Sequence, residues 1–183
     1  MARDHSGEYN VSLAGRLLVA STVLGDPNFD RTVVFMLQHD EEGALGLVLN
    51  RPSASKVLEH LSWLAGSVIE PGVVFVGGPV EPEVAIALES TDTPDRPTAL
   101  PGVGLADVNQ VEAGAPLRVF SGYSGWGEGQ LEEELATDAW IVVGAEPGDV
   151  FTQDPEGLWA TVLRRQGGHL TLLSTYPPHP SLN

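Results

Sequence analysis

Short apolar runs separated by polar turns dominate this chain, and most of them are too brief for a helix. The run at 32–37 is rich in β-branched and aromatic residues, which favour strands. A polar stretch ending in Gly43 separates it from a second apolar run at 44–49, a spacing typical of an antiparallel hairpin. The whole pattern predicts strands at 17–20, 32–37, 44–49, 73–76, 84–88, 117–120, 140–143 and 170–173.

Three segments show helical features instead. Residues 56–64 carry apolar side chains at i, i+1, i+4 and i+7. Residues 129–137 place acidic side chains near their N-terminal end, where the helix dipole favours negative charge. Asp154 followed by proline is a typical helix start, and Gly167 is a typical stop. Between these segments, the proline-rich stretch 91–104 predicts a long surface loop.

The order of these elements indicates the fold class. Strands outnumber helices, and the early strands are linked by short turns rather than by crossover helices. That order favours an α+β fold with mostly antiparallel pairing over a doubly wound parallel sheet. A length of 183 residues is typical of one domain. We expect a flexible N-terminus at 1–12, a single domain at 13–175 and an extended C-terminal tail at 176–183.

The net charge of the chain narrows the classes of partner that it is expected to bind. Acidic residues outnumber basic ones by 25 to 9, which gives a net charge of −16. Such a surface repels phosphate backbones and anionic lipid, so it argues against direct nucleic-acid binding. It suits simple solubility, which we favour, or a basic protein partner or a cation.

Other compositional features bear on location and chemistry. No apolar run reaches the ~18 residues of a membrane span, and the polar N-terminus does not resemble a signal peptide. We therefore expect a cytoplasmic protein with no membrane partner. Cysteine is absent, which excludes disulfides and thiolate catalysis.

The most distinctive segment is Gly122–Gly129, in which glycines surround Trp126. Its start resembles the nucleophile elbow of hydrolases, with Ser124 as the hydroxyl, but Trp126 stands where the second glycine is required. It also precedes a predicted helix, as a phosphate loop does, yet it lacks the lysine and spacing, and its carboxylates would repel phosphate. The sequence favours a tight strand-to-helix connection, with Trp126 as a packing anchor and Ser124 as a turn hydroxyl.

Two polar clusters are further candidate sites. The run His39–Glu42 gathers potential metal ligands, but four adjacent residues in a short turn cannot all face one ion. A solvated hairpin turn is favoured there over an adventitious hard cation. Arg51 follows Asn50 where a predicted strand ends at Pro52. It fits a structural ion pair with a carboxylate, which we favour, or an anion-binding arginine.

Beyond single clusters, the chain carries a series of short motifs in order: Leu18–Ala20, Asp26–Val33, His39, Glu42–Gly46, Asn50–Pro52, Gly77–Val80, Gly122–Gly127, Gly129–Glu132 and Trp140. Jointly this series, within about Gly15 to Trp159, resembles the bacterial YqgE/AlgH family. The chain departs from the family pattern at 81–89, where many relatives have an Arg-Gly-aromatic strand ending in His. It departs again at Ser124, which is commonly alanine, and this lowers the case for a serine nucleophile.

The resemblance implies a single α+β domain whose bent, mostly antiparallel sheet forms a pseudo-barrel with flanking helices. It also implies a bacterial cytoplasmic protein of unsettled biochemical function, in a family often labelled as transcriptional regulators. The family has no agreed catalytic residues and no agreed cofactor. The resemblance therefore assigns neither to this chain.

The sequence supports two functional hypotheses. The first, which we favour, is a non-enzymatic regulator that acts through an unknown protein partner. It rests on the resemblance, the acidic composition and the incomplete catalytic motifs. The second is a small-ligand-binding protein or weak hydrolase, with no cofactor or metal. Its pocket would be lined by Asn50, Arg51, Gly77, Gly78, Tyr123 and Trp126.

Overall fold

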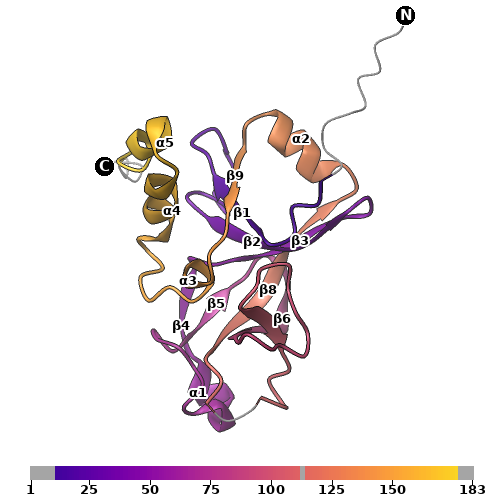
Figure 1. The fold of residues 1–183 in the computed structure, drawn as a ribbon, viewed down its shortest axis with the longest axis vertical. Coiled ribbons are helices and arrows are strands. Elements are labelled where there is room, and N and C mark those ends of the chain that lie inside the picture. Colours follow the sequence, from indigo (N-terminus) through magenta and orange to yellow (C-terminus); the bar gives the residue numbers. More distant parts are fainter. Residues whose placement is uncertain (1–10, 112–113, 177–183) are drawn as a thin grey trace, which may run out of the picture.

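The computed structural model describes residues 11–111 and 114–176, in which one sheet is flanked by helices (Figure 1). The strands are β1 (Arg16–Ala20), β2 (Val33–Asp40), β3 (Gly43–Val48), β4 (Pro52–Lys56), β5 (Val73–Val76), β6 (Val80–Ser90), β7 (Val103–Ala106), β8 (Leu117–Gly127) and β9 (Trp140–Gly144). The helices are α1 (Val57–His60), α2 (Gln130–Ala136), α3 (Pro147–Val150), α4 (Leu158–Gln166) and α5 (Gly168–Leu173), with a 3-10 helix at Ser62–Leu64. Most of the predicted N-terminal segment and C-terminal tail lies outside the described residues, in 1–10 and 177–183.

The sheet confirms the predicted α+β class with mostly antiparallel pairing. Its main path runs β4-β5-β8-β3-β2-β1-β9, and β6 pairs with both β7 and β8. Every pairing between named strands is antiparallel except the one between β5 and β8. The expectation of a pseudo-barrel needs correction, because β4 and β9 end the path without pairing to each other among the described residues. The sheet is therefore open rather than closed into a barrel.

Strand β8 pairs with β3, β5 and β6, and its extent corrects the prediction of a strand-to-helix connection at the glycine-tryptophan segment. Its first part pairs with β6 and β5, and its last part pairs with β3, where Ala44 lies opposite Trp126. The segment is therefore strand up to Gly127, and the connection to α2 is only Glu128 and Gly129. Gly129 takes φ +72°, which favours glycine at this sharp entry into the helix.

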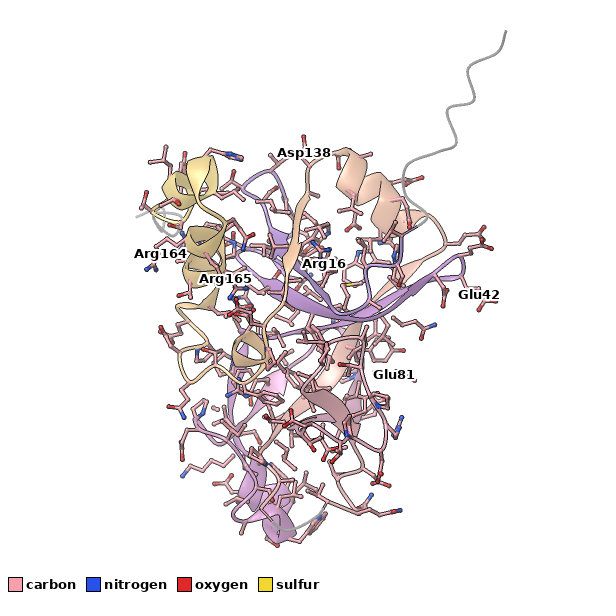
Figure 2. The ribbon with its side chains drawn as sticks, viewed as in Figure 1. Arg16, Glu42, Glu81, Asp138, Arg164 and Arg165 are labelled. Carbon is pink, nitrogen blue, oxygen red and sulfur yellow. The ribbon has the colours of Figure 1, made fainter. Side chains whose placement is uncertain are left out.

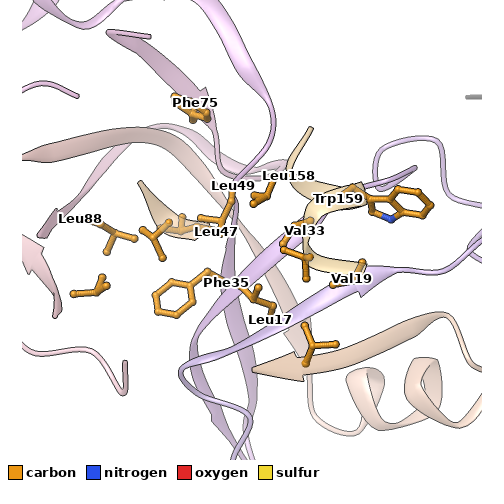
Figure 3. Close-up of a cluster of buried hydrophobic side chains, with 14 of the residues drawn as sticks. Leu17, Val19, Val33, Phe35, Leu47, Leu49, Phe75, Leu88, Leu158 and Trp159 are labelled. Atoms are coloured by element: carbon orange, nitrogen blue, oxygen red, sulfur yellow. The ribbon is translucent and has the colours of Figure 1, made fainter. Parts of the chain in front are cut away.

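Side chains along β1 and β2 alternate between two faces, as the period of a strand requires. Leu17, Val33 and their neighbours face a cluster that includes Trp159 of α4 (Figure 3). Leu18 and Val34 face a second cluster that contains Trp126 and Trp140. The sheet thus has apolar cover on both faces, with α4 on one side and α2 on the other (Figure 1).

Several boundaries differ from the sequence prediction. Pro52 is the first residue of β4, whereas the sequence pattern placed it only at the end of the preceding strand. Proline is tolerated at the first residue of an edge strand. The last two residues of the predicted loop and the two residues after it form β7, Val103–Ala106. The predicted strand 170–173 is instead part of α5, because a short apolar run does not distinguish a strand from a helix by periodicity. Asp154 accepts a hydrogen bond from the Gly157 amide in a turn, and α4 begins only at Leu158.

Candidate functional site

The candidate site is a hollow of about 440 Å³ between the end of β3, the segment entering β2, and the helices α4 and α5. We call it the arginine pocket, because two guanidinium groups line it together with polar and aromatic side chains. Its lining includes Arg31, Asn50, Arg51, Trp159, Ser174 and Tyr176. Of these, sequence reasoning named only Asn50 and Arg51.

Asn50 fixes the backbone on which the pocket is built. Its Nδ2 donates to the carbonyl oxygen of Arg31 at 2.8 Å, and its Oδ1 accepts the Val33 amide at 2.9 Å. Arg31 has φ +53°, a conformation that is strained for a residue with a side chain. Because Asn50 is buried and both ends of its amide are occupied, it acts by positioning Arg31 rather than by facing a ligand.

The two arginines that line the pocket have donors to spare. The Cζ of Arg31 lies 4.4 Å from the ring centroid of Trp159, and the same guanidinium donates to the carbonyl oxygen of Tyr176. Arg51 donates through Nη2 to the carbonyl oxygen of Asp30. A guanidinium carries five N–H donors, so most of them remain without a hydrogen-bond acceptor in both groups among the described residues. The favoured prediction of an ion pair for Arg51 is wrong within 11–111 and 114–176, where neither arginine is paired with a carboxylate.

The remaining polar groups of the arginine pocket determine its charge and the hydrogen bonds that it can offer to a ligand. Glu156 is exposed at the lining and is the carboxylate that partly offsets the two positive charges. Ser174 Oγ donates to the Thr171 carbonyl at 2.6 Å, and Thr175 Oγ1 donates to the Leu172 carbonyl at 2.7 Å. Both hydroxyl protons are therefore in use, and these oxygens can only accept. The positively charged donors available to a ligand are the guanidinium groups.

Arg118 shows what a purely structural arginine looks like in this protein. It is 1% exposed, and its two terminal nitrogens donate to the carbonyl oxygens of Glu70, Val150 and Thr152. Its Cζ lies 4.4 Å from the ring centroid of Phe75. Burial lowers the pKa of this guanidinium to about 10. Arg31 and Arg51 differ from it in being accessible from a hollow.

Glycine is required at Gly77 and Gly78 because the backbone of β8 crosses closely there, and not because a ligand approaches. A Cβ on Gly77 would lie 2.4 Å from the carbonyl oxygen of Gly122, and one on Gly78 would lie 2.2 Å from the carbonyl of Tyr123. Only glycine allows β8 to approach this closely. Gly78 also lines a neighbouring hollow of about 400 Å³ that Arg51 shares, whereas Gly77 lines none of the hollows described here.

The last two predicted residues lie apart from the arginine pocket. Tyr123 donates its hydroxyl to Glu81 Oε2 at 2.9 Å, and this hydrogen bond raises the pKa of the Tyr123 phenol. Trp126 is 6% exposed and packs against Trp140, which confirms its prediction as a packing anchor. The structure therefore brings Asn50, Arg51 and Gly78 near one another and leaves the two aromatic residues elsewhere.

Ser124, considered as a nucleophile, and His39, considered as a metal ligand, are both engaged in structural contacts. Ser124 is fully buried and donates to the carbonyl oxygen of Gly77 at 3.2 Å. His39 Nδ1 accepts the Leu13 amide at 3.0 Å, and its Nε2 lies 2.8 Å from Glu132 Oε1. This arrangement gives Ser124 the bonding of a structural hydroxyl.

The acidic turn considered for a cation lies far from the basic end of α4. Glu42 is at the tip of the β2–β3 hairpin, on the opposite side of the view from Arg164 and Arg165 (Figure 2). Asp40 in this turn accepts hydrogen bonds from Gln38 and from the Glu42 amide, and the bond from Gln38 is the main cause that lowers its pKa. Among the residues that the structure describes, no group of three or more His, Asp or Glu side chains is arranged to hold a metal. None of the helices there is long and apolar enough to cross a bilayer.

Sequence reasoning missed Arg31 and the α5 end of the pocket. Arg31 lies 145 positions from Tyr176, so their contact has no local signal. The only available hint was that Arg31 stands inside one of the motifs of the family resemblance, between a turn and the strand at 32–37.

Known proteins match this chain over nearly the same residues as those motifs. A family model described as AlgH-like matches residues 17–171. The UPF0301 protein of Streptomyces avermitilis is 49% identical to this chain, and that of Thermobifida fusca is 44% identical. Each alignment covers 94% of this chain and 96% of the relative.

Solved structures with a similar fold include the crystal structure of protein DIP2367 from Corynebacterium diphtheriae. Its TM-score is 0.79 at 25% identity, over 96% of this chain and 95% of that one. The solution structure of the AlgH protein from Pseudomonas aeruginosa has a TM-score of 0.68 at 28% identity, over 98% and 100% of the two chains. None of these names states an activity.

Proposed function

The chain belongs to the AlgH-like family, as its motifs predicted, and on that premise we propose that it is a non-enzymatic cytoplasmic binding protein. Its ligand is a small organic anion held by Arg31 and Arg51. The observation that carries the proposal is that both guanidinium groups line one hollow with open donors and without a carboxylate partner among the described residues. In a chain with a net charge of −16, two arginines that line the same hollow concentrate positive charge at one place.

The chemistry of the pocket narrows the ligand class. Guanidinium groups bind carboxylate and phosphate oxygens through paired hydrogen bonds, often in bidentate form. The oxygens of Ser174 and Thr175 accept but do not donate, so they suit ligand hydroxyl groups. Its volume of about 440 Å³ falls in the size range of small-molecule pockets. A hydroxylated carboxylate or a phosphate ester matches all three properties.

The test is a binding measurement with a charge-matched control. Citrate, glycerol 3-phosphate and inorganic phosphate are titrated by calorimetry at constant ionic strength into the wild type, Arg51→Gln and Arg164→Gln. Arg164 is exposed on α4 and does not line the pocket, so its variant removes the same charge elsewhere. We expect Arg51→Gln to weaken binding by about ten-fold or more, as hydrogen bonds between charged groups predict. Binding that is equally weak in both variants, or undetectable in the wild type, would contradict the anion site.

A regulatory role through a protein partner is the second part of this proposal. It is supported by the net charge of −16, which favours a basic protein over nucleic acid. The experiment is a gel shift with genomic DNA fragments at physiological salt. We expect no tight, sequence-specific complex from the isolated protein, and the appearance of one would overturn this part while leaving the anion site untouched.

A further inference from the structure

A second hollow, which we call the aromatic pocket, lies on the other face of the sheet from the arginine pocket. Its volume is about 330 Å³, and it lies between the β1–β2 connection and α2. Aromatic rings and carboxylates line it, and no arginine, lysine or histidine does so among the described residues. Its lining includes Leu24, Asp26, Phe29, Trp126, Gln130 and Glu134.

Glu134 brings to this pocket a negative charge that the surrounding protein does not neutralise. Its Oε2 accepts the indole N–H of Trp126 at 2.9 Å and that of Trp140 at 2.7 Å. Its Oε1 accepts Nε2 of Gln130 at 3.1 Å. All three donors are neutral, so they fix the carboxylate without cancelling its charge. Within the described ranges Glu134 has no ion-pair partner.

Ring surfaces lie beside that charge and are held in place. The ring centroids of Phe29 and Trp126 are 6.4 Å apart, with an interplanar angle of 32°. Trp140 packs edge-on against both rings, at 75° to Phe29 and 77° to Trp126, and it does not line the pocket. A cation is attracted to the face of an aromatic ring, and most strongly to that of tryptophan. Asp26 adds an exposed carboxylate on the β1–β2 connection.

The arginine pocket provides an internal reference for this arrangement. There the protein supplies its own cation, because Arg31 lies over the ring of Trp159. In the aromatic pocket the rings and carboxylates are present, but no side chain among the described residues supplies the positive charge. The aromatic pocket therefore supplies the rings of a cation–π interaction, and no described side chain supplies the cation.

We propose that the aromatic pocket binds an organic cation with an apolar envelope, namely an alkylated or quaternary ammonium group. The rings attract the charge and contact the methyl or methylene groups, while Glu134 and Asp26 supply the counter-charge. Such a group can be a free small molecule or the side-chain ammonium of a lysine on a basic partner. The proposal is independent of the anion site in the arginine pocket.

The experiment follows the indole N–H signals of the protein by nuclear magnetic resonance. The wild type is titrated at constant ionic strength with choline, with n-butylammonium as an analogue of a lysine side chain, and with 3,3-dimethylbutan-1-ol as a neutral isostere of choline. The signals are assigned by Trp→Phe variants. We expect saturable shifts of the Trp126 and Trp140 signals with at least one cation, small changes at Trp63, and no saturable response to the alcohol.

Two variants locate the binding and a third is their control. Asp26→Asn keeps the Oδ1 that accepts the Asn28 amide, so it removes charge while preserving the local turn. Phe29→Leu removes one ring face. We expect each to weaken cation binding by up to about five-fold. Glu128→Gln removes an exposed carboxylate just before α2 that does not line the pocket, and it should leave the affinity unchanged.

The outcomes distinguish a free ligand from a protein partner as the source of the cation, and they can disprove the proposed site. A preference for choline supports a free quaternary ammonium ligand, and a preference for n-butylammonium supports a lysine of a protein partner. The proposal fails if neither cation gives a saturable shift, or if the neutral alcohol binds equally well. It also fails if Glu128→Gln weakens binding as much as Asp26→Asn, since the effect would then be a general response to charge.

Discussion

The arginine pocket and the aromatic pocket share the connection between β1 and β2 but have opposite chemistry. Between β1 and β2, Phe29 lines the aromatic pocket and Arg31 lines the arginine pocket. One pocket holds guanidinium groups whose donors are mostly open, and the other holds a carboxylate whose hydrogen bonds come from neutral donors. The comparison shows that the same segment can place unlike charges on the two faces of one sheet.

The two pockets also differ in how much the fold depends on their charged residues. Glu134 joins Trp126 and Trp140, which both belong to the buried cluster on its face of the sheet. Arg51 makes a single hydrogen bond to the backbone within the described residues. We therefore expect Glu134 of the aromatic pocket to contribute to the stability of the protein, and Arg51 of the arginine pocket to contribute little to it.

Replacing Glu134 by alanine tests the first half of this comparison and has the largest expected effect. It leaves two largely buried indole N–H groups without their acceptor. We expect the free energy of unfolding to fall by about 2–4 kcal/mol, measured by urea denaturation. Glu133→Ala, at an exposed position of the same helix, is the control and should change stability by less than about 0.5 kcal/mol. Similar losses in both variants would show that α2 helicity, and not the indole contacts, is responsible.

Replacing Asn50 by alanine tests how the arginine pocket is held. The change removes the donor to the Arg31 carbonyl and the acceptor of the Val33 amide at a buried position. We expect a loss of about 1–3 kcal/mol in the free energy of unfolding, together with weaker anion binding because Arg31 is no longer fixed. Unchanged anion affinity in the folded variant would show that the left-handed conformation of Arg31 does not need Asn50.

Replacing Arg51 by glutamine should separate ligand binding from folding. Its one hydrogen bond to the Asp30 carbonyl is exposed, so we expect the free energy of unfolding of the unliganded protein to change by less than about 0.5 kcal/mol. Chemical denaturation without added anions measures this directly. A loss as large as that of Asn50→Ala would make Arg51 a structural residue and remove the contrast between the two pockets.

The sheet was predictable because its signal is local. Runs such as 32–37 and 44–49 show the composition and spacing of a hairpin, and β2 and β3 form where they predict one. The open sheet was not predictable, because closure depends on whether β4 and β9 meet, and no periodicity reports that. The glycine-tryptophan segment was misjudged for a physical reason: its first glycine, Gly122, serves a close crossing with 77–78, and only Gly129 serves the turn into α2.

The candidate sites were only partly predictable from sequence. Asn50 and Arg51 were visible as polar residues that end a strand, and Trp126 as a large ring among glycines. Arg31 and Tyr176 meet only through the tertiary fold. The acceptor role of Glu134 was equally hidden, because it is the last of three consecutive glutamates and only its helix position distinguishes it.

The smallest expected effect concerns the acid sensitivity of the contact between α2 and the β2–β3 hairpin. Burial alone would raise the pKa of Glu132, but the hydrogen bond with His39 and the neighbouring interactions outweigh it, and the pKa is lowered. A carboxyl whose pKa is lower in the folded state stabilises the protein above its unfolded pKa. That contribution is lost as the pH falls through the folded pKa.

Comparing Glu132→Gln with Glu133→Gln isolates this contribution. Denaturation midpoints are measured from neutral pH down to the acidic range in which carboxyl groups titrate. We expect the Glu132 variant to lose stability at neutral pH and to show a shallower decline towards acid than Glu133→Gln, because the group responsible has been removed. Parallel pH profiles would mean that α2 is held by Glu134 and its two tryptophans without help from His39, which would sharpen the view of the aromatic pocket as the anchor of this face.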